Sequence, residues 1–293
     1  VGCGLSGAAG WSFAAPDLVD RLRIGPDDPR RAVVRLRNPM SEDQSVLRTS
    51  LLGSLLDVAR RNHARGMGDV RVFETGTVYF DDEPLPEERR HLAALLTGAL
   101  RPPSWRDEDP PPADFYAAKG VLAALLHAIR VPWRVERGRE PFLHPGRSAR
   151  VLVGDGGEPA GWLGELHPAV ARSWDLEGGA GFELDLAALE RTATLVPRYE
   201  DLTSFPAVLQ DRAWWFPPDV PADEVLATVR EAGGALLRRA EIFDVYPAGD
   251  RVSLAVRLEF RAADRTLTDD EVAQRRETID AVVAERLGGE PRG

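Results

Sequence analysis

The sequence has 293 residues, of which 43% are hydrophobic and 29% are charged, and its formal net charge at pH 7 is −10. This composition is typical of a folded globular protein and excludes an intrinsically disordered chain, and the length allows two domains of ordinary size. No apolar run approaches the roughly 18 residues that a membrane span requires, and the negative charge argues against a general nucleic-acid binder, which normally carries a basic surface.

The first residues and the cysteine content concern the origin of the chain. The sequence begins Val-Gly-Cys-Gly-Leu, without an initiator methionine or an export signal, so we expect it to be the interior of a longer chain. Cys3 is the only cysteine, which excludes an internal disulfide and fits the reducing cytoplasm.

Short strand patterns alternate with two helix patterns in the first two thirds of the sequence. An apolar helical face precedes Gly66, a suitable C-cap, and a second helix is predicted at 117–129. The first face comprises Leu51, Leu52, Leu55, Leu56, Val58 and Ala59. Strands are predicted at 33–36, 70–79, 91–96, 149–153, 160–165 and 182–186, with a hairpin turn at 154–157. This pattern favours an α+β fold, an antiparallel sheet with helices packed on one side.

Two breaks in the pattern divide the sequence. Prolines at 102–103 and 110–112 indicate an extended surface connector, which we interpret as a loop inside the first domain. The pattern changes again at Val-Pro-Arg-Tyr, residues 196–199, and we place the domain boundary near residue 196. The predicted domains are therefore 1–196 and 197–293.

The second domain has a simpler order of elements. We predict a strand at 212–216, a helix at 222–232, strands at 239–246 and 251–261, and a helix from a capping box at Thr268 and Glu271 to about Leu287. With room for a final strand, this is the ferredoxin-like βαββαβ plan. Pro291 falls in the place of that strand and lacks a backbone donor, so the sequence leaves open whether the strand forms.

Several short blocks of the sequence form a pattern when they are taken in order. Residues 38–52 read Asn-Pro-Met-Ser-Glu-Asp-Gln-Ser-Val-Leu-Arg-Thr-Ser-Leu-Leu, and 72–79 read Val-Phe-Glu-Thr-Gly-Thr-Val-Tyr. The other blocks are Asp-Phe at 114, Lys-Gly at 119, Leu-His-Pro-Gly-Arg-Ser-Ala at 143, Gly-Trp-Leu-Gly-Glu-Leu-His-Pro at 161, Ser-Phe-Pro-Ala-Val at 204, Phe-Asp-Val-Tyr at 243 and Arg-Thr-Leu-Thr-Asp at 265. Together they span nearly the whole sequence, and in this order they resemble the second half of the beta subunit of bacterial phenylalanine–tRNA ligase.

The resemblance carries expectations about fold and partners. It implies that residues 1–196 resemble a class II synthetase core and that 197–293 resemble the ferredoxin-fold anticodon-binding domain. Members of this family form a cytoplasmic α2β2 enzyme in which the alpha subunit carries out aminoacylation with ATP and Mg²⁺. The sequence is therefore expected to be a C-terminal fragment of the beta subunit that binds no cofactor itself. Its expected partners are the alpha subunit and tRNA(Phe), and neither membrane nor DNA is expected.

The same resemblance implies that the first domain is not catalytic. Class II enzymes hold ATP phosphates with arginines, whose guanidinium donates two parallel hydrogen bonds to phosphate oxygens. Phe80 stands where active relatives place one such arginine, and residues 182–190 contain acids but no Gly-x-Gly. A carboxylate facing a triphosphate is unfavourable. Arg48 is either a relic phosphate ligand or, as we favour, an anchor of the helix start through backbone carbonyls or Glu74.

The histidines give no clear metal or acid–base site. His144 and His167 each precede a proline, and without a cysteine or third histidine at ligand spacing a structural role is favoured. His63, His91 and His127 are isolated and are interpreted as ordinary surface or core residues. Ser148 lacks the Gly-x-Ser-x-Gly setting of a nucleophile, and the 154–157 turn lacks the helix that a phosphate loop needs. We therefore predict no catalytic or metal-binding residue.

The composition of the second domain does not indicate RNA binding. Residues 198–293 contain 13 Arg and 19 Asp or Glu, which gives a net charge of 13 − 19 = −6. The strand at 251–261 nevertheless alternates, with apolar even positions and odd positions that include Arg251, Arg257 and Arg261. Because successive side chains point to opposite faces, these arginines are predicted on the open face of the sheet.

Neighbouring strands are predicted to add aromatic residues to that face. We assign Phe243 and Val245 to the core, and Asp244 and Tyr246 to the open face. Trp214 and Trp215 are adjacent and cannot both be core, so Trp214, which shares its parity with Arg212, is predicted on the open face. Aromatic residues among arginines hold single-stranded bases by stacking. The predicted tRNA contacts are Arg212, Trp214, Tyr246, Arg251, Arg257, Arg261 and Arg265.

Two hypotheses about function follow. In the first, the chain is a non-catalytic part of an aminoacylating ligase, with a scaffold domain that presents an apolar patch to the alpha subunit and a domain that binds the anticodon stem-loop. In the second, it is a stand-alone structural or binding module of the same fold, whose sheet face is solvated or covered by another domain. An active enzyme is disfavoured by Phe80 and the missing glycines.

Overall fold

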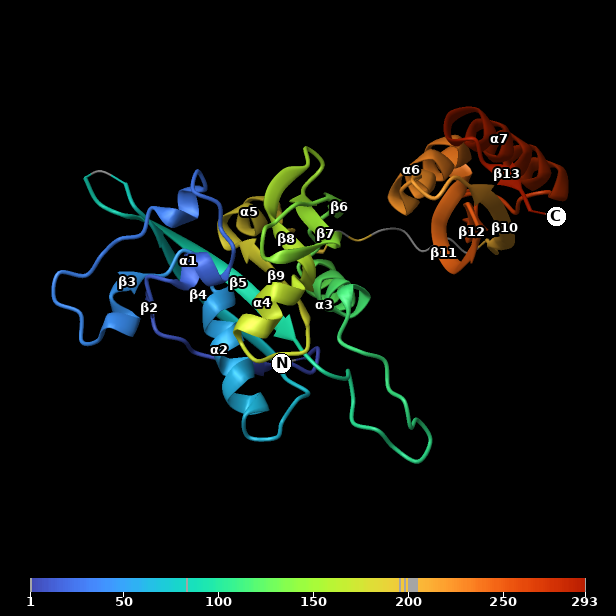
Figure 1. Ribbon diagram of the computed structural model, residues 1–293. Coiled ribbons are helices and arrows are strands. Elements are labelled where there is room, and N and C mark those ends of the chain that lie inside the picture. Colours follow the sequence, from blue (N-terminus) through green and yellow to red (C-terminus); the bar gives the residue numbers. More distant parts are fainter. Residues whose placement is uncertain (1, 83, 195, 198, 200–204, 293) are drawn as a thin grey trace. The chain divides into compact units, whose positions relative to one another are not determined.

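The computed structural model describes residues 2–82, 84–194, 196–197, 199 and 205–292 (Figure 1). The chain separates into two compact units, Val1–Pro197 and Arg198–Gly293. Ser204, in the block that opens the predicted second domain, lies outside the described residues. Within the described ranges, every helix is too short or too polar to cross a membrane.

A seven-stranded sheet forms the centre of the first unit. Its strands are Ser6–Gly7 (β1), Arg71–Phe80 (β4), Glu87–Leu96 (β5), Trp133–Arg137 (β6), Leu143–Val153 (β7), Glu158–Leu166 (β8) and Ala180–Asp185 (β9). Their order in the sheet is β1-β4-β5-β9-β8-β7-β6, and all pairs are antiparallel except β1 with β4. A separate pair joins Phe13–Ala14 (β2) to Val46–Leu47 (β3).

Helices cover both faces of this sheet. They are Leu18–Arg21 (α1), Leu52–His63 (α2), Phe115–Ala128 (α3), Pro168–Ser173 (α4) and Leu186–Thr192 (α5), with short 3₁₀ helices at Pro29–Arg31 and Glu42–Gln44. In β5, Ala93 and Leu95 pack in the core cluster of α2 and α4, whereas Ala94 and Leu96 pack in that of α3 and α5. Because alternate residues point to opposite faces, the sheet is buried on both sides, and the predicted one-sided arrangement is wrong.

The sequence patterns missed or misplaced several short elements. The strand predicted at 33–36 does not form, since this segment makes only an isolated bridge from Arg35 to Val46. β6, α4 and α5 were not predicted, because each is too short to show a clear period. Side-chain caps start the two helices: His167 accepts from the Ala169 amide, and Asp185 accepts from the Ala187 amide.

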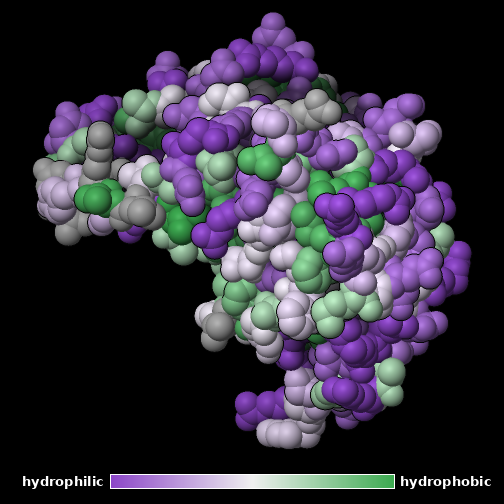
Figure 2. All heavy atoms as spheres, turned by 90° about the vertical axis from the view of Figure 1, so that its left-hand side faces the viewer, coloured by the Kyte–Doolittle hydropathy of each residue, from purple (hydrophilic) through white to green (hydrophobic). Residues whose placement is uncertain are grey.

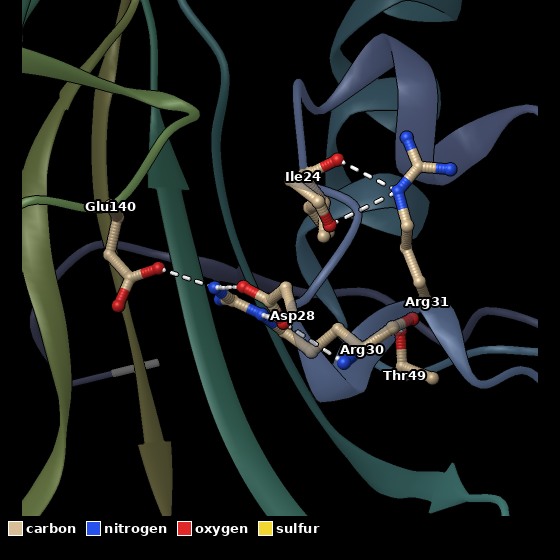
Figure 3. A network of polar contacts seen from close by, with 7 residues as sticks. Ile24, Asp28, Arg30, Arg31, Thr49 and Glu140 are labelled. Carbon is tan, nitrogen blue, oxygen red and sulfur yellow. Dashed lines mark hydrogen bonds and ion pairs between the residues drawn. The ribbon is translucent and has the colours of Figure 1, made fainter.

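An ion-pair network fixes the segment that precedes α2 (Figure 3). Arg30 Nη2 lies 2.6 Å from Asp28 Oδ2 and 2.8 Å from Glu140 Oε2, and Thr49 Oγ1 donates to the Arg30 carbonyl at 3.1 Å. Burial alone lowers the pKa of Arg30, but the hydrogen bonds and charges of the two carboxylates outweigh it and raise that pKa. The hydrogen bond from Arg30 lowers the pKa of Asp28. The irregular chain before the helix is thereby held in place.

The second unit has the predicted ferredoxin-like fold. Its strands are Val208–Phe216 (β10), Leu237–Ala248 (β11), Arg251–Phe260 (β12) and Glu290–Pro291 (β13), in the antiparallel order β11-β12-β10-β13. Its helices are Ala222–Gly233 (α6) and Asp269–Leu287 (α7), with a 3₁₀ turn at Gly234–Leu236. The last strand forms at the sheet edge, where a proline is tolerated, and the Arg292 amide donates to Ala213 at 2.8 Å.

The core of the second unit lies between its sheet and α6 and α7. Trp214, Leu254 and Val256 pack there against Val229 and Ile279 of the helices. Alternate residues of the strands therefore point to the opposite face, which we call the open face. Its rows follow the strand register: Glu290–Trp215–Ser253–Tyr246, then Ala213–Ala255–Asp244, then Asp211–Arg257–Glu241.

Candidate functional site

The end of β4 carries Phe80 beside an ion pair of the neighbouring strand β5. Phe80 is the last residue of the strand, and the Arg89 guanidinium carbon lies 4.8 Å from the centre of its ring. Arg89 is itself paired with Glu87, at 2.6 Å between Nη2 and Oε2. That hydrogen bond lowers the pKa of Glu87. The nearest cation is thus stacked on Phe80 and neutralised by a carboxylate.

Arg48 is an anchor of the helix start, as favoured from the sequence. Its Nη1 lies 2.6 Å from Glu74 Oε1 and 3.1 Å from Ser54 Oγ, and its Nε donates to the Thr77 carbonyl at 3.0 Å. The Arg48 and Glu74 side chains are only 4% and 2% exposed. A Cβ on Gly76 would lie 2.2 Å from Arg48 Nη2, so a glycine is required beside the guanidinium. The pair joins β4 to the start of α2.

Glu183 of β9 forms a second buried polar group. It accepts hydrogen bonds from Ser50 Oγ at 2.7 Å and from the Leu51 amide at 3.2 Å, and its Oε1 lies 2.7 Å from His91 Nδ1. Burial alone raises the pKa of Glu183, but these hydrogen bonds and the His91 charge outweigh it, and the pKa lies below its usual value. The interpretation of His91 as isolated was wrong, because pairing of β5 with β9 brings it to Glu183.

These groups do not fit a nucleotide triphosphate. Arg48 is already bound to a carboxylate, and Glu183 would place a second negative charge near the phosphates. Glu74 Oε2 is buried without a hydrogen-bond partner among the described residues, and it needs a donor that phosphate oxygens cannot supply. The arrangement therefore links the strands β4, β5 and β9 to the start of α2.

The other sequence candidates in the first unit have structural contacts. His144 Nδ1 accepts from the Gly146 amide and His167 Nδ1 from the Ala169 amide, both at 3.1 Å, as expected for turn residues. Ser148 Oγ donates to the Gly138 carbonyl at 2.8 Å. Across the described ranges, no three His, Cys, Asp or Glu side chains gather into a group that could hold a metal ion.

Trp215, and not Trp214, lies on the open face of the second unit. Trp214 is fully buried and its Nε1 donates to Asp280 of α7 at 2.9 Å, so its assignment to the open face was wrong. Its register explains this, because Trp214 pairs with the core residue Leu254. Trp215 instead meets Tyr246 edge to face, with ring centres 6.2 Å apart. Tyr246 is 52% exposed, and its prediction on the open face is in accord with this contact.

Arg212 was also assigned to the wrong face. It pairs with the core residue Val256, and its guanidinium reaches Asp280, with Nε at 3.1 Å from Oδ1. An arginine is tolerated on the helix side because its stem covers apolar surface while the charged end pairs with a carboxylate. Asp280 therefore links Arg212 and Trp214 to α7.

Phe243 and Val245 are not core residues. They are 50% and 57% exposed. A β-bulge between Ile242 and Asp244 changes the alternation of β11 and accounts for Phe243. Val245 pairs with the core residue Leu254 but stays exposed on this edge strand. The bulge brings the Phe243 ring to Arg257, whose guanidinium carbon lies 4.9 Å from the ring centre. Arg257 also pairs with Asp211 at 2.8 Å, and this hydrogen bond lowers the pKa of Asp211.

The remaining predicted arginines lie in three different places. Arg251 pairs with Glu290, and its guanidinium carbon is 5.7 Å from the Trp215 ring centre. Arg261 follows the end of β12 and lies 3.9 Å from Glu259. Arg265 lies in the loop before α7, where it pairs with Glu271. The structure therefore places Arg251 beside the Trp215–Tyr246 pair, whereas Arg265 lies in a different segment, the loop before α7.

We call Trp215, Tyr246, Ser253 and Arg292 the aromatic cluster. Three of these residues were not predicted from the sequence. Trp215 was excluded by the wrong parity, and Ser253, another odd position of the strand at 251–261, was not among the predicted contacts. Arg292 was missed because the final strand was in doubt. Its guanidinium carbon lies 5.1 Å from the Trp215 ring centre and 5.3 Å from that of Tyr246. The adjacent tryptophans were the available signal, and only the register could choose between them.

Comparison with known sequences identifies both units. Residues 1–186 match the family described as the phenylalanyl tRNA synthetase beta chain CLM domain. The chain belongs to the phenylalanine–tRNA ligase beta-subunit family. Residues 203–292 match the ferredoxin-fold anticodon binding domain, in agreement with the strand order of the second unit.

Curated members of the beta-subunit family are similar along nearly the whole chain. The beta subunit of Symbiobacterium thermophilum is 43% identical over 296 residues, which cover 96% of this chain and 33% of that protein. The beta subunit of Moorella thermoacetica is 42% identical, covering 97% and 36%, and that of Geobacillus kaustophilus is 38% identical, covering 100% and 36%. The chain thus spans about a third of the length of the curated relatives it matches.

Proposed function

We propose that this chain is a non-catalytic part of phenylalanine–tRNA ligase, the enzyme that attaches phenylalanine to its tRNA with ATP. The first unit supports the catalytic alpha subunit in an α2β2 enzyme, and the second unit binds the anticodon stem-loop of tRNA(Phe). ATP and Mg²⁺ serve the complete cytoplasmic enzyme and are held outside this chain. Family membership supports the assignment, as do the buried ion pairs where phosphate ligands would be needed.

The arrangement of the open face is the observation that carries the RNA assignment. The small residues Ala213 and Ala255 pair with each other. They form a shallow surface, here called the floor, between the Trp215–Tyr246 row and Arg257. Arg257 lies four positions after Ser253 in β12, a span of about 13 Å at roughly 3.3 Å per residue. Unpaired bases stack on exposed aromatic rings while arginines contact their phosphates. The floor has the length of a few nucleotides of single-stranded RNA.

The arginines of this face are available for exchange with phosphates. Arg257 and Asp211 are 51% and 47% exposed, and Arg251 and Glu290 are 48% and 69% exposed. Exposed ion pairs contribute little to folding, so the guanidinium groups can change partners at low cost. Because the unit is acidic as a whole, attraction to RNA is local, and binding weakens as the salt concentration rises.

A surface of the first unit that exposes two aromatic side chains suits a protein partner. Trp11 is 70% exposed and Phe13 is 38% exposed, and both line a cavity of about 540 Å³ beside α2. Figure 2 shows the side on which β2 and β3 lie in Figure 1, with apolar surface among hydrophilic side chains. Exposed tryptophans are frequent anchors of protein interfaces. We assign this surface to contact with the alpha subunit.

The alternative is a stand-alone binding or structural module of the same fold. The relatives reported above are all beta subunits of the ligase, and this favours the ligase role. A stand-alone module would not require the alpha subunit, so association with that subunit separates the two proposals.

The test is co-purification with the alpha subunit, followed by a charging assay. The complete beta subunit and a version without residues 197–293 are each co-expressed with tagged alpha subunit. We expect both to co-purify with it, and we expect charging of tRNA(Phe) to fall when the second unit is absent. Loss of association in both versions, or equal charging at limiting tRNA, contradicts the proposal.

A further inference from the structure

Arg292 occupies the corner between the two aromatic rings of the open face. Its guanidinium carbon lies 5.1 Å and 5.3 Å from the ring centres of Trp215 and Tyr246, which meet at an interplanar angle of 68°. Its Nη1 donates to Ser253 Oγ at 3.3 Å, and Ser253 is only 1% exposed. The guanidinium thus covers the buried hydroxyl and faces both rings.

The backbone of Arg292 is fixed independently of its side chain. The Arg292 amide donates to the Ala213 carbonyl at 2.8 Å, and the preceding Pro291 pairs with Trp214 in the sheet. The side chain therefore leans back over the neighbouring row from an anchored position. Rotation about its own bonds can remove the guanidinium from the rings without breaking β13.

A planar guanidinium and a nucleobase compete for the same surface. Cations over aromatic rings are attracted by the ring quadrupole, and bases stack on the same ring faces. A base that enters the corner would replace the ring contacts of Arg292 and could offer a hydrogen bond to Ser253 Oγ. Both cannot occupy the corner at once, because the guanidinium carbon already lies 5.1 Å and 5.3 Å from the two ring centres.

We infer that Arg292 is an internal stand-in for a nucleobase, which the RNA must displace when it binds. This inference rests on the proposed function of the open face and adds a competing contact that lowers the apparent affinity of the free chain. The contact selects for bases that stack well enough to replace it.

The test compares RNA binding by three variants of the 293-residue chain. The probe is a synthetic RNA hairpin with the anticodon stem-loop sequence of tRNA(Phe), and binding is followed by fluorescence anisotropy. Arg292→Ala is expected to bind about five- to tenfold more tightly at moderate salt, because competition by two cation–ring contacts is removed. The matched control Arg251→Ala, which removes an arginine paired with Glu290, is expected to bind more weakly. Trp215→Ala is expected to bind about tenfold more weakly.

The outcomes separate the two proposals. Weaker binding by Arg292→Ala, equal to that of Arg251→Ala, overturns the stand-in while the RNA-binding face remains supported by Trp215→Ala. Unchanged binding by Trp215→Ala overturns both. A second readout is the NMR signal of the Arg292 Nε–H group, which the two rings shift in the free chain. It should move to the position of a solvated arginine when RNA is added, and a signal that stays in place also contradicts displacement.

Discussion

Arg48 and Glu183 show how single charged residues decide the character of the first unit. Each is buried with its partners already in place, Arg48 with Glu74 and Glu183 with Ser50 and His91. A buried charge without a partner is strongly unfavourable, so these groups are committed to the fold. The sequence was sufficient to predict the Arg48 contact, because Glu74 lies in the adjacent strand pattern. It could not predict the Glu183 contact, which joins strands far apart in the chain.

The first prediction concerns the buried ion pair. Arg48→Met should lower the free energy of unfolding of the first unit by about 3–5 kcal/mol, because it leaves the Glu74 carboxylate buried and unpaired. The matched control is Arg134→Met, which removes the exposed pair with Glu136 and should cost less than about 1 kcal/mol. Denaturant-dependent amide exchange in β4 and β5 measures both. Equal effects of the two substitutions would refute the structural role of Arg48.

The second prediction concerns pH. The folded pKa of Glu183 is lowered, so its carboxylate contributes stability above the unfolded pKa of about 4.3, and this contribution is lost as the pH falls through the folded pKa. At pH 7, Glu183→Gln should therefore be less stable than the native chain by about 1–3 kcal/mol. The difference should shrink below about pH 4. Urea unfolding at several pH values checks this, and a difference that does not vary with pH would argue against the ionised carboxylate.

At the scale of the element, strand phase decides which side chains lie on the open face. The alternation of apolar residues with polar or small ones along β12 is unbroken, so the two faces of this strand could be predicted from the sequence. For β10, either Trp214 or Trp215 could have faced the core. Arg212 lies on the helix side, and its charge favoured the wrong choice. In β11 the bulge at Phe243 reverses the alternation, and nothing in the residues nearby announces it. The fold and topology of the second unit could thus be predicted from the sequence, whereas the residues of the aromatic cluster could be identified only from the strand register.

The third prediction separates the two tryptophans. Trp214→Ala should destabilise the second unit by about 3–5 kcal/mol, because it leaves a cavity in the core and removes one of the hydrogen bonds to Asp280. Trp215→Ala should change stability by about 1 kcal/mol or less, since its ring lies on the open face. Urea unfolding of the second unit measures both. A larger cost for Trp215→Ala would mean that the strand phase is reversed.

At the scale of the whole molecule, we propose a class II-like first unit that does not catalyse the reaction. The fourth prediction is that the purified chain shows no phenylalanine-dependent ATP–pyrophosphate exchange. Phe80→Arg should not create that activity, because the new arginine would still meet a centre whose buried groups are Arg48, Glu74 and Glu183. Exchange by either protein above that of a heat-denatured control would show that the first unit is catalytic.

The most direct measurement is steady-state charging by the complete ligase assembled with a beta subunit carrying Trp215→Ala and Arg257→Glu. If the open face binds tRNA and the chemistry belongs to the alpha subunit, the KM for tRNA(Phe) should rise about tenfold or more, whereas ATP–pyrophosphate exchange should be unchanged. The exposed residue Trp105 provides the matched control, and Trp105→Ala should leave the KM for tRNA unaltered. An unchanged KM for tRNA in the double variant would contradict the account.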